Sequence, residues 1–140
     1  MNTSAHLATR PIQAYQVPDD TRLETLPRHF GKHMLAVEDS VYYFMRQLAK
    51  DYSGGYWHFY ELSNGGFYMA PECESLILTV NGNGYAGHMS ADAGGITACL
   101  FAFSHLSFRI RDDTISCHYY QLREFALDHI EASAILAAID

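Results

Sequence analysis

The stretch YWHFYELSNGGFYMAP, residues 56–71, begins with residues 56–62, whose side chains follow the period of two that is typical of β-strands. Trp57 and Phe59 point to one face, whereas residues 56, 58 and 60 point to the other. Ser-Asn-Gly-Gly at residues 63–66 is typical of a hairpin turn. The stretch therefore predicts an antiparallel hairpin of strands 56–62 and 67–70, which Pro71 closes.

Downstream of this hairpin the strand pattern continues. Residues 75–80 are rich in Leu, Ile, Thr and Val and predict a third strand. Asn-Gly-Asn-Gly at residues 81–84 predicts a second turn, and residues 85–89 predict a short fourth strand. Together these segments predict a small antiparallel β-meander of three to four strands.

Helical patterns flank the predicted strands. Val37 begins an apolar face that continues at residues 41, 44, 45 and 48. Ser90 is suited to cap the next helix. This helix is apolar nearly all round, which predicts that it lies at the centre of the fold, and its Gly94-Gly95 pair indicates close packing. Further helices are predicted from Asp112-Asp113 to residue 127 and over residues 132–139. We therefore predict an α+β fold, a single compact domain in which the meander packs with about four to five helices.

The beginning of the chain carries weaker signals. Residues 1–18 are mostly small or polar, and Pro11 and Pro18 interrupt them, so we expect a flexible N-terminal arm over 1–18 and a domain over 19–140. Asp19-Asp20 predicts a short capped turn that stops at Pro27.

Composition limits the classes of function. The 140 residues carry a formal net charge of −7, which disfavours strong DNA binding because phosphates repel it. The 16 acidic residues are scattered, whereas a DNA mimic would carry rows of carboxylates. The three cysteines have no paired spacing, which favours a reducing compartment. The first ten residues lack the apolar h-region of a signal peptide, and no apolar run reaches the ~18 residues needed to span a membrane. We therefore expect a cytoplasmic protein that does not enter a membrane.

Several motifs that resemble active sites have simpler interpretations. Residues 82–87 match G-x-G-x-x-G, but the best helix start follows this motif, which favours a plain turn. His29 and His33 have a zinc-like spacing, but Pro27 interrupts the helix they would need. Cys99 lies on an apolar stripe, which predicts an inert thiol. We therefore predict no metal, no cofactor and no catalytic residue.

Longer strings in the sequence resemble the ArdB/KlcA family of antirestriction proteins. The strings are DYSGGYWHFYELSNGGFYMAP at 51–71, LPRHFG at 26–31, NGNG at 81–84, MSADAGGI at 89–96, HYYQLREFA at 118–126 and the final Ile139-Asp140. They cover the chain from about residue 23 to its end. The resemblance implies a cytoplasmic protein of plasmids or other mobile elements that relieves type I restriction of incoming DNA, and a compact α+β fold.

The resemblance supplies no catalytic residue, so we expect a non-enzymatic inhibitor that contacts the type I restriction–modification complex or a host factor controlling it. The candidate partner-binding residues come from turn tips and polar or aromatic faces; they are Tyr56, Tyr60, Asn64, Asn83, Arg123 and Asp140. Tyr119-Tyr120 with Arg109, Arg111 and Arg123 predicts a second patch of this kind. An exposed aromatic strand would also suit a homodimer.

Two alternatives remain open at this point. One is a small cytoplasmic hydrolase or nucleic-acid-processing enzyme, for which Glu61 and Glu74 could meet across strands as an acid pair. The other is indirect action through host regulation or proteolysis.

Overall fold

The structure, a computed structural model, describes residues 11–140. Its strands form two small antiparallel sheets: β1 (Ala14–Gln16), β2 (Trp57–Leu62) and β3 (Phe67–Pro71) in the order β1-β2-β3, and the hairpin of β4 (Ser75–Val80) and β5 (Tyr85–Ser90). The helices and 3-10 turns are η1 (Asp19–Glu24), α2 (Thr25–Phe30), η2 (Gly31–His33), α3 (Met34–Leu48), α4 (Ala91–Ser107), α5 (Asp113–Leu127) and α6 (Ala132–Ile139). This arrangement confirms the predicted α+β class.

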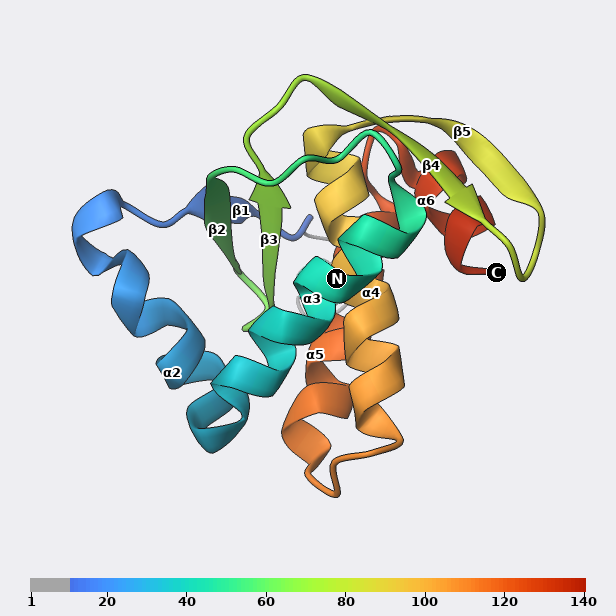
Figure 1. Cartoon of the computed structure of the whole chain (residues 1–140). Helices are drawn as coiled ribbons and strands as arrows, with labels where there is room; N and C mark the ends of the chain where they lie inside the picture. Colours follow the sequence, from blue (N-terminus) through green and yellow to red (C-terminus); the bar gives the residue numbers. More distant parts are fainter. Residues whose placement is uncertain (1–10) are drawn as a thin grey trace, which may run out of the picture.

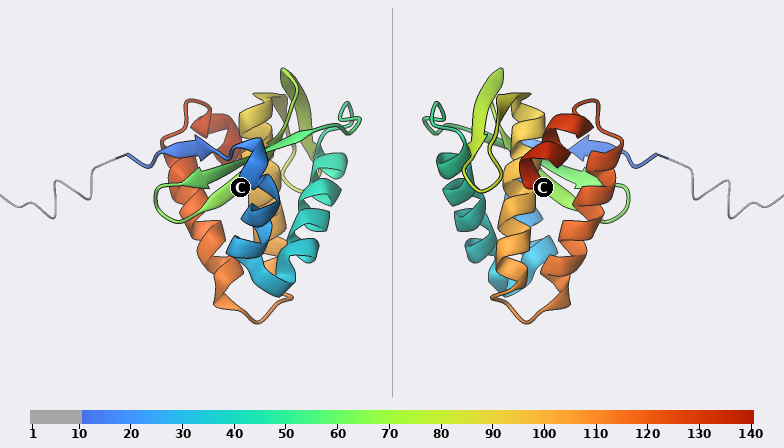
Figure 2. Two further views of the ribbon diagram at one scale, coloured as in Figure 1. Left: turned by 90° about the vertical axis from the view of Figure 1, so that its left-hand side faces the viewer. Right: turned by 90° about the vertical axis from the view of Figure 1, so that its right-hand side faces the viewer.

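Helix α4 is the centre of the molecule. It is flanked by α3 and α5, as Figures 1 and 2 show, and β3 and α6 also pack against it. Ser90 caps it by accepting a hydrogen bond from the backbone N–H of Ala93, as predicted. Because neighbours surround the first half of α4, an apolar side chain is favourable at almost every position there, and the helix needs no polar face.

The predicted close packing at Gly94-Gly95 is confirmed. A Cβ atom at Gly95 would lie 2.5 Å from the Cβ of Ala70 and from the carbonyl oxygen of Met69 on β3. At Gly94 it would lie 2.7 Å from a methyl group of Leu76 on β4. The two glycines therefore let both sheets approach the same helix.

The predicted meander divides into two sheets. β3 ends at Pro71, which has no N–H to continue a ladder, and exposed residues 72–74 lead the chain to β4. On β4, Leu76 and Leu78 are buried on the α4 side, while Ile77 is 46% exposed. The second hairpin is therefore held by its packing on the helices and not by pairing with β3.

Part of the expected flexible arm belongs to the domain. Ala14 pairs with Leu62 and Gln16 with Tyr60, and Val17 is buried. The expectation of a loose arm is therefore wrong for residues 14–17, while residues 1–10 lie outside the described residues. The turn expected to stop at Pro27 instead continues as α2, because proline is tolerated in the first turn of a helix.

Within residues 11–140, no helix is both long and apolar enough to cross a membrane.

Candidate functional site

Three segments that are far apart in the sequence meet in a buried polar cluster. His29 on α2 lies between Glu61 on β2 and His118 on α5, with its Nε2 2.6 Å from Glu61 Oε1 and its Nδ1 2.9 Å from His118 Nε2. His118 Nδ1 lies 2.8 Å from the carbonyl oxygen of Thr114, and Arg28 forms an ion pair with Glu61 from the solvent side. We call Glu61, His29 and His118 the inner triad.

Aromatic side chains enclose the inner triad. The His29 ring lies 5.3 Å from that of Phe67, and the His118 ring lies 4.5 Å from that of Phe30. The side chain of His29 is only 9% exposed. Burial lowers the pKa of His118, and the neighbouring His29 lowers it further, against the opposing effect of the hydrogen bond to Thr114.

A second histidine–carboxylate pair lies at the start of α4. Asp92 accepts hydrogen bonds from the hydroxyl of Tyr68 at 2.6 Å and from Nε2 of His129 at 2.8 Å. Nδ1 of His129 accepts a hydrogen bond from the backbone N–H of Glu131, and the Glu131 carboxylate in turn accepts from Ser90. Burial raises the pKa of Asp92, but the hydrogen bonds from His129 and Tyr68 outweigh it and hold that pKa below its usual range.

The titratable groups of both clusters are paired with other protein groups. The acid pair suggested for Glu61 and Glu74 does not form, because Glu61 lies at one end of the β2–β3 hairpin and Glu74 follows Pro71 at the other. His33 lies 3.5 Å from Asp112 and not on a shared site with His29. Among residues 11–140, no three His, Cys, Asp or Glu side chains gather in a way that could hold a metal ion.

The thiol of Cys99 is buried in the core. It donates to the carbonyl oxygen of Met69, and burial raises its pKa to about 12. A thiol of this kind stays protonated and inert at neutral pH, as predicted for Cys99.

The two predicted asparagines have structural roles. Asn64 donates to the carbonyl oxygen of Gln121 on α5 and accepts from Gly66 within its own turn. Asn83 donates to the carbonyl oxygens of Ala137 and Ala138, near the end of α6. Each joins a hairpin tip to a helix, so the reason for assigning them to a partner surface, that folding does not need them, is wrong.

The two predicted tyrosines also contact their own chain. Tyr56 is 43% exposed, and its hydroxyl donates to Asp19 while Arg22 lies over its ring at 4.4 Å. Tyr60 is half-buried and stacks on Tyr68 with ring centroids 4.6 Å apart. Tyr56 therefore presents part of a ring to solvent, whereas Tyr60 mainly packs.

Arg123 and Asp140 lie beside a different surface. Arg123 follows Tyr119 and Tyr120 by one turn of α5, and Asp140 follows Ile139 at the end of α6. Between α4 and α5 is a hollow of about 260 Å³, lined by Ser104, Ser107, Phe108, Ser116, Tyr119 and Tyr120. A smaller neighbouring hollow shares Ser104 and Tyr119 and extends to Ile139.

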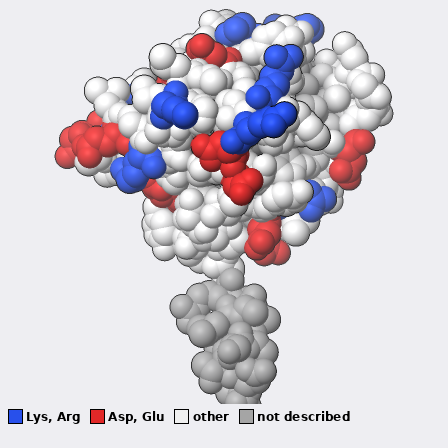
Figure 3. Space-filling view, turned by 90° about the horizontal axis from the view of Figure 1, so that it is seen from below, with Lys and Arg blue, Asp and Glu red and all other residues white. Residues whose placement is uncertain are grey.

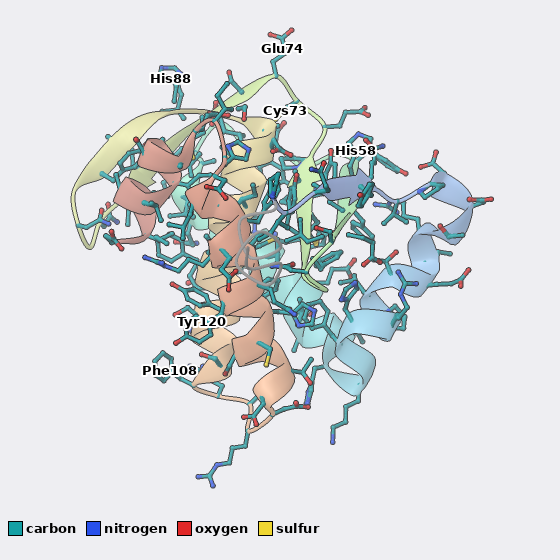
Figure 4. The ribbon with its side chains drawn as sticks, turned by 180° about the vertical axis from the view of Figure 1, so that it is seen from behind. His58, Cys73, Glu74, His88, Phe108 and Tyr120 are labelled. Atoms are coloured by element: carbon teal, nitrogen blue, oxygen red, sulfur yellow. The ribbon has the colours of Figure 1, made fainter. Side chains whose placement is uncertain are left out.

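The same end of α4 also borders α3. There a hollow of about 420 Å³ is lined by Asp39, Ser40, Tyr43, Phe44, His105 and Arg109. We call the exposed rings of Tyr43, Phe108 and Tyr120, together with the hollows between them, the α4 face. Phe108 is 90% exposed and Tyr120 65%, and Figure 4 shows them near each other, far from Glu74 and Cys73.

Sequence reasoning found part of the α4 face, namely Tyr119-Tyr120 with the arginines, but missed Tyr43 and Phe108. The apolar character of the helix predicted its central position, and no local pattern showed that the chain becomes exposed at His105 and at Phe108, directly after α4. The inner triad was also missed, since its members are separated by 32 and 57 positions along the chain and no local spacing marks them.

Charges of both signs are interspersed on the lower end of the molecule. Figure 3 shows lysine and arginine side chains among the acidic ones there, and no row of carboxylates crosses this face of the described residues. On this face, the acidic side chains therefore do not form rows like those of DNA phosphates.

Comparison with known proteins gives consistent results. The sequence model of a family described as "Antirestriction protein" matches residues 50–140. The antirestriction protein KlcA of Escherichia coli is 47% identical over 138 residues, with 93% of this chain and 94% of that protein covered. The uncharacterized protein YafX of Escherichia coli K12 is 44% identical over 131 residues, with 89% and 85% covered.

A solved structure has the same fold. Its chain superposes with a TM-score of 0.85 and 46% identity, and 94% of this chain and 96% of that chain are covered. It comes from work on the KlcA and ArdB proteins, which are described as having a novel fold and antirestriction activity against type I DNA restriction systems in vivo but not in vitro.

Proposed function

This chain belongs to the antirestriction protein family, and from that premise we propose that it relieves type I restriction of incoming foreign DNA in the bacterial cytoplasm by a non-enzymatic mechanism. The observation that carries the proposal is the solved structure with 46% identity over 94% of the chain, since the KlcA and ArdB proteins are described as active against type I systems in vivo. The same proposal places the gene on a plasmid or another mobile element.

The chemistry of the described residues supports an inhibitor that binds and does not react. His29, His118 and His129 are all engaged in hydrogen bonds inside the protein, and the Cys99 thiol is buried. A general base must reach a substrate proton, and a nucleophile must reach a substrate atom. These side chains meet neither requirement.

We assign partner binding to the α4 face. Exposed aromatic rings and arginines are enriched in protein interfaces, and hollows between the rings offer pockets for partner side chains. Arg109 lines one hollow, and Arg123 lies one turn along α5 from Tyr119 and Tyr120, which line another. Asp140 follows Ile139, which lines the third. The net charge of −7 favours a protein partner over a nucleic acid.

The partner is either the type I complex or a host factor that controls it. The KlcA and ArdB proteins are described as inactive in vitro, which favours a host factor or another component present only in the cell. A second copy of the chain on the α4 face is the competing occupant, and a homodimer would appear as a doubled mass in solution.

The proposal is tested by plating unmodified phage on a type I-proficient host with and without this gene. We expect the gene to restore the plaque count while methylation of host DNA stays unchanged. An unchanged count, with folded protein verified in the cells, would refute the proposed function.

The α4 face is tested by the double variant Phe108→Ser/Tyr120→Ser. Loss of two exposed anchors is expected to weaken partner binding at least ~10-fold and to reduce protection, with stability unchanged. Leu23→Ser is the matched control, because Leu23 is 86% exposed on η1, away from the α4 face. Equal protection by all three proteins would remove the α4 face from the proposal.

A further inference from the structure

The hydrogen bonds of the inner triad can be counted against the hydrogens available to make them. Three contacts run in a row: Glu61 to His29, His29 to His118, and His118 to the carbonyl oxygen of Thr114. Both ends of this row are acceptors, because an ionised carboxylate and a carbonyl oxygen carry no hydrogen. Each contact therefore needs one hydrogen from an imidazole.

Two neutral imidazoles supply only two of the three hydrogens. If His118 donates from Nδ1 to Thr114 and His29 donates from Nδ1 to His118, then Nε2 of His29 is bare and faces a carboxylate oxygen 2.6 Å away. Two acceptors at that distance repel each other. The row is complete only when it holds one further proton.

We propose that Glu61, His29 and His118 form a proton-binding site, which holds one proton more than a carboxylate and two neutral imidazoles. With that proton the three side chains carry no net charge and every contact in the row has its hydrogen, whereas without it two acceptor atoms face each other at one of the three contacts. The ligand is the proton itself, shared along the row, and the bound form ties α2, β2 and α5 together.

The surroundings favour a charge on the Glu61 side of the row. Burial lowers the pKa of His118, so the additional proton resides on His29 beside the Glu61 carboxylate. The other charged groups near the row are Arg28, which pairs with Glu61, and the His33–Asp112 pair, which joins η2 to the first turn of α5. Phe30, Phe67 and Phe103 contribute no charge.

The Asp92–His129 pair is an internal control for this count. Tyr68 donates its own hydrogen to Asp92, the backbone of Glu131 donates its own to Nδ1 of His129, and a neutral His129 donates the third from Nε2 to Asp92. This network is complete without an additional proton. Protonation of His129 would set two N–H groups against each other.

The site predicts a specific dependence of folding on pH. Unfolded imidazoles lose their protons above about pH 6.5, whereas the folded row keeps one, so the folded state binds more protons there. Stability from this site is therefore lost as the pH rises above that value. In Glu61→Gln the amide N–H₂ donates to Nε2 of His29 and the amide oxygen accepts from Arg28, which completes the row without the proton.

The first test is a nitrogen-15 spectrum of the histidine rings in the full chain at pH 7.5, assigned with single His→Gln variants. We expect three protonated ring nitrogens on His29 and His118 together and one on His129. One protonated nitrogen on each of His29 and His118 would overturn the proposal, whether or not any variant folds.

The second test compares urea unfolding of the unaltered protein and Glu61→Gln between pH 7 and 8. The ratio of their folding equilibrium constants is expected to fall about tenfold over this interval, the amount for one proton. Asp92→Asn is the matched control, and its ratio to the unaltered protein should stay constant. A constant ratio for Glu61→Gln as well would show that the inner triad holds no additional proton.

Discussion

The inner triad and the Asp92–His129 pair look alike at first sight, and their difference is instructive. In each, a histidine that is 9% exposed contacts a carboxylate within 2.8 Å. What differs is the atom on the other side of the ring. His129 meets a backbone N–H there, which requires a bare nitrogen, whereas His29 meets a second imidazole whose far nitrogen faces a carbonyl oxygen. The contact beyond a histidine, and not the carboxylate beside it, decides how many protons it carries.

The largest difference between the two regions should appear when one histidine is removed from each: His118 from the inner triad and His129 from the Asp92–His129 pair. His118→Leu leaves a buried N–H of His29 without an acceptor and is expected to lower the free energy of unfolding by about 1–3 kcal/mol. His129→Leu is expected to cost less, because the Asp92 side chain is 39% exposed and water can replace the lost donor. Urea unfolding at pH 6.5 measures both, and a larger loss for His129→Leu would contradict the comparison.

A smaller effect is expected in acid and separates the regions by the pH range in which each lowered pKa acts. The pKa of Asp92 is held below its usual range, so the folded state binds fewer protons than the unfolded state near pH 4, and the stability it contributes is lost as the pH falls further. Asp92→Asn should therefore flatten the decline in melting temperature below pH 4. If the melting temperature of Asp92→Asn fell as steeply below pH 4 as that of the unaltered protein, the hydrogen bonds from Tyr68 and His129 would not be holding the carboxylate ionised.

The inner triad should respond in a different pH range. Burial lowers the pKa of His118, so unfolded imidazole takes up protons below about pH 6.5 while the folded one does not, and stability falls as the pH falls through that range. His118→Leu is expected to reduce the decline of the melting temperature between pH 6.5 and 5, whereas Asp92→Asn leaves it unchanged. If the melting temperature of His118→Leu declined between pH 6.5 and 5 as steeply as that of the unaltered protein, the decline would come from other histidines.

The smallest effect is expected at the outer edge of the inner triad. Arg28 is 55% exposed, so its ion pair with Glu61 is screened by solvent, and Arg28→Gln should cost at most about 1 kcal/mol. The cost should shrink further in 0.5 M salt, because salt screens exposed charges. A salt-independent loss of several kcal/mol would mean that Arg28, and not the buried histidines, stabilises the contact of α2 with β2 and α5.

Local patterns predicted the elements but only part of their arrangement. The alternation at residues 56–62 and the cap at Ser90 depend on neighbouring residues, and the structure confirms both. β1 escaped prediction because its three residues are all exposed and show no alternation. The division into two sheets followed from the packing of β4 on the helices beyond the exposed residues 72–74, and no strand pattern records that packing.

The candidate surface shows the same limit. The Tyr119-Tyr120 pair was selected from the sequence and lines the hollows of the α4 face, and Arg123 and Asp140 are close along the chain to residues that line them. Asn64 and Asn83 were selected by the same reasoning, yet their amides donate to carbonyl oxygens of Gln121 on α5 and of Ala137 and Ala138 near the end of α6. Turn-tip asparagines look free in a sequence because the carbonyl groups they bind lie more than 50 positions away.

By itself the sequence determined most of the secondary structure, the central place of α4 and the family, because periodicity, caps and long motifs depend on residues that are close together. Only the tertiary structure decided which histidine meets which carboxylate and what lies on the far side of each ring. Those contacts join α2, β2 and α5 in one region, and β3, α4 and the end of α5 in the other. Proton positions follow from such contacts, since a hydrogen bond depends on atoms a few ångströms apart in space and not on their separation along the chain.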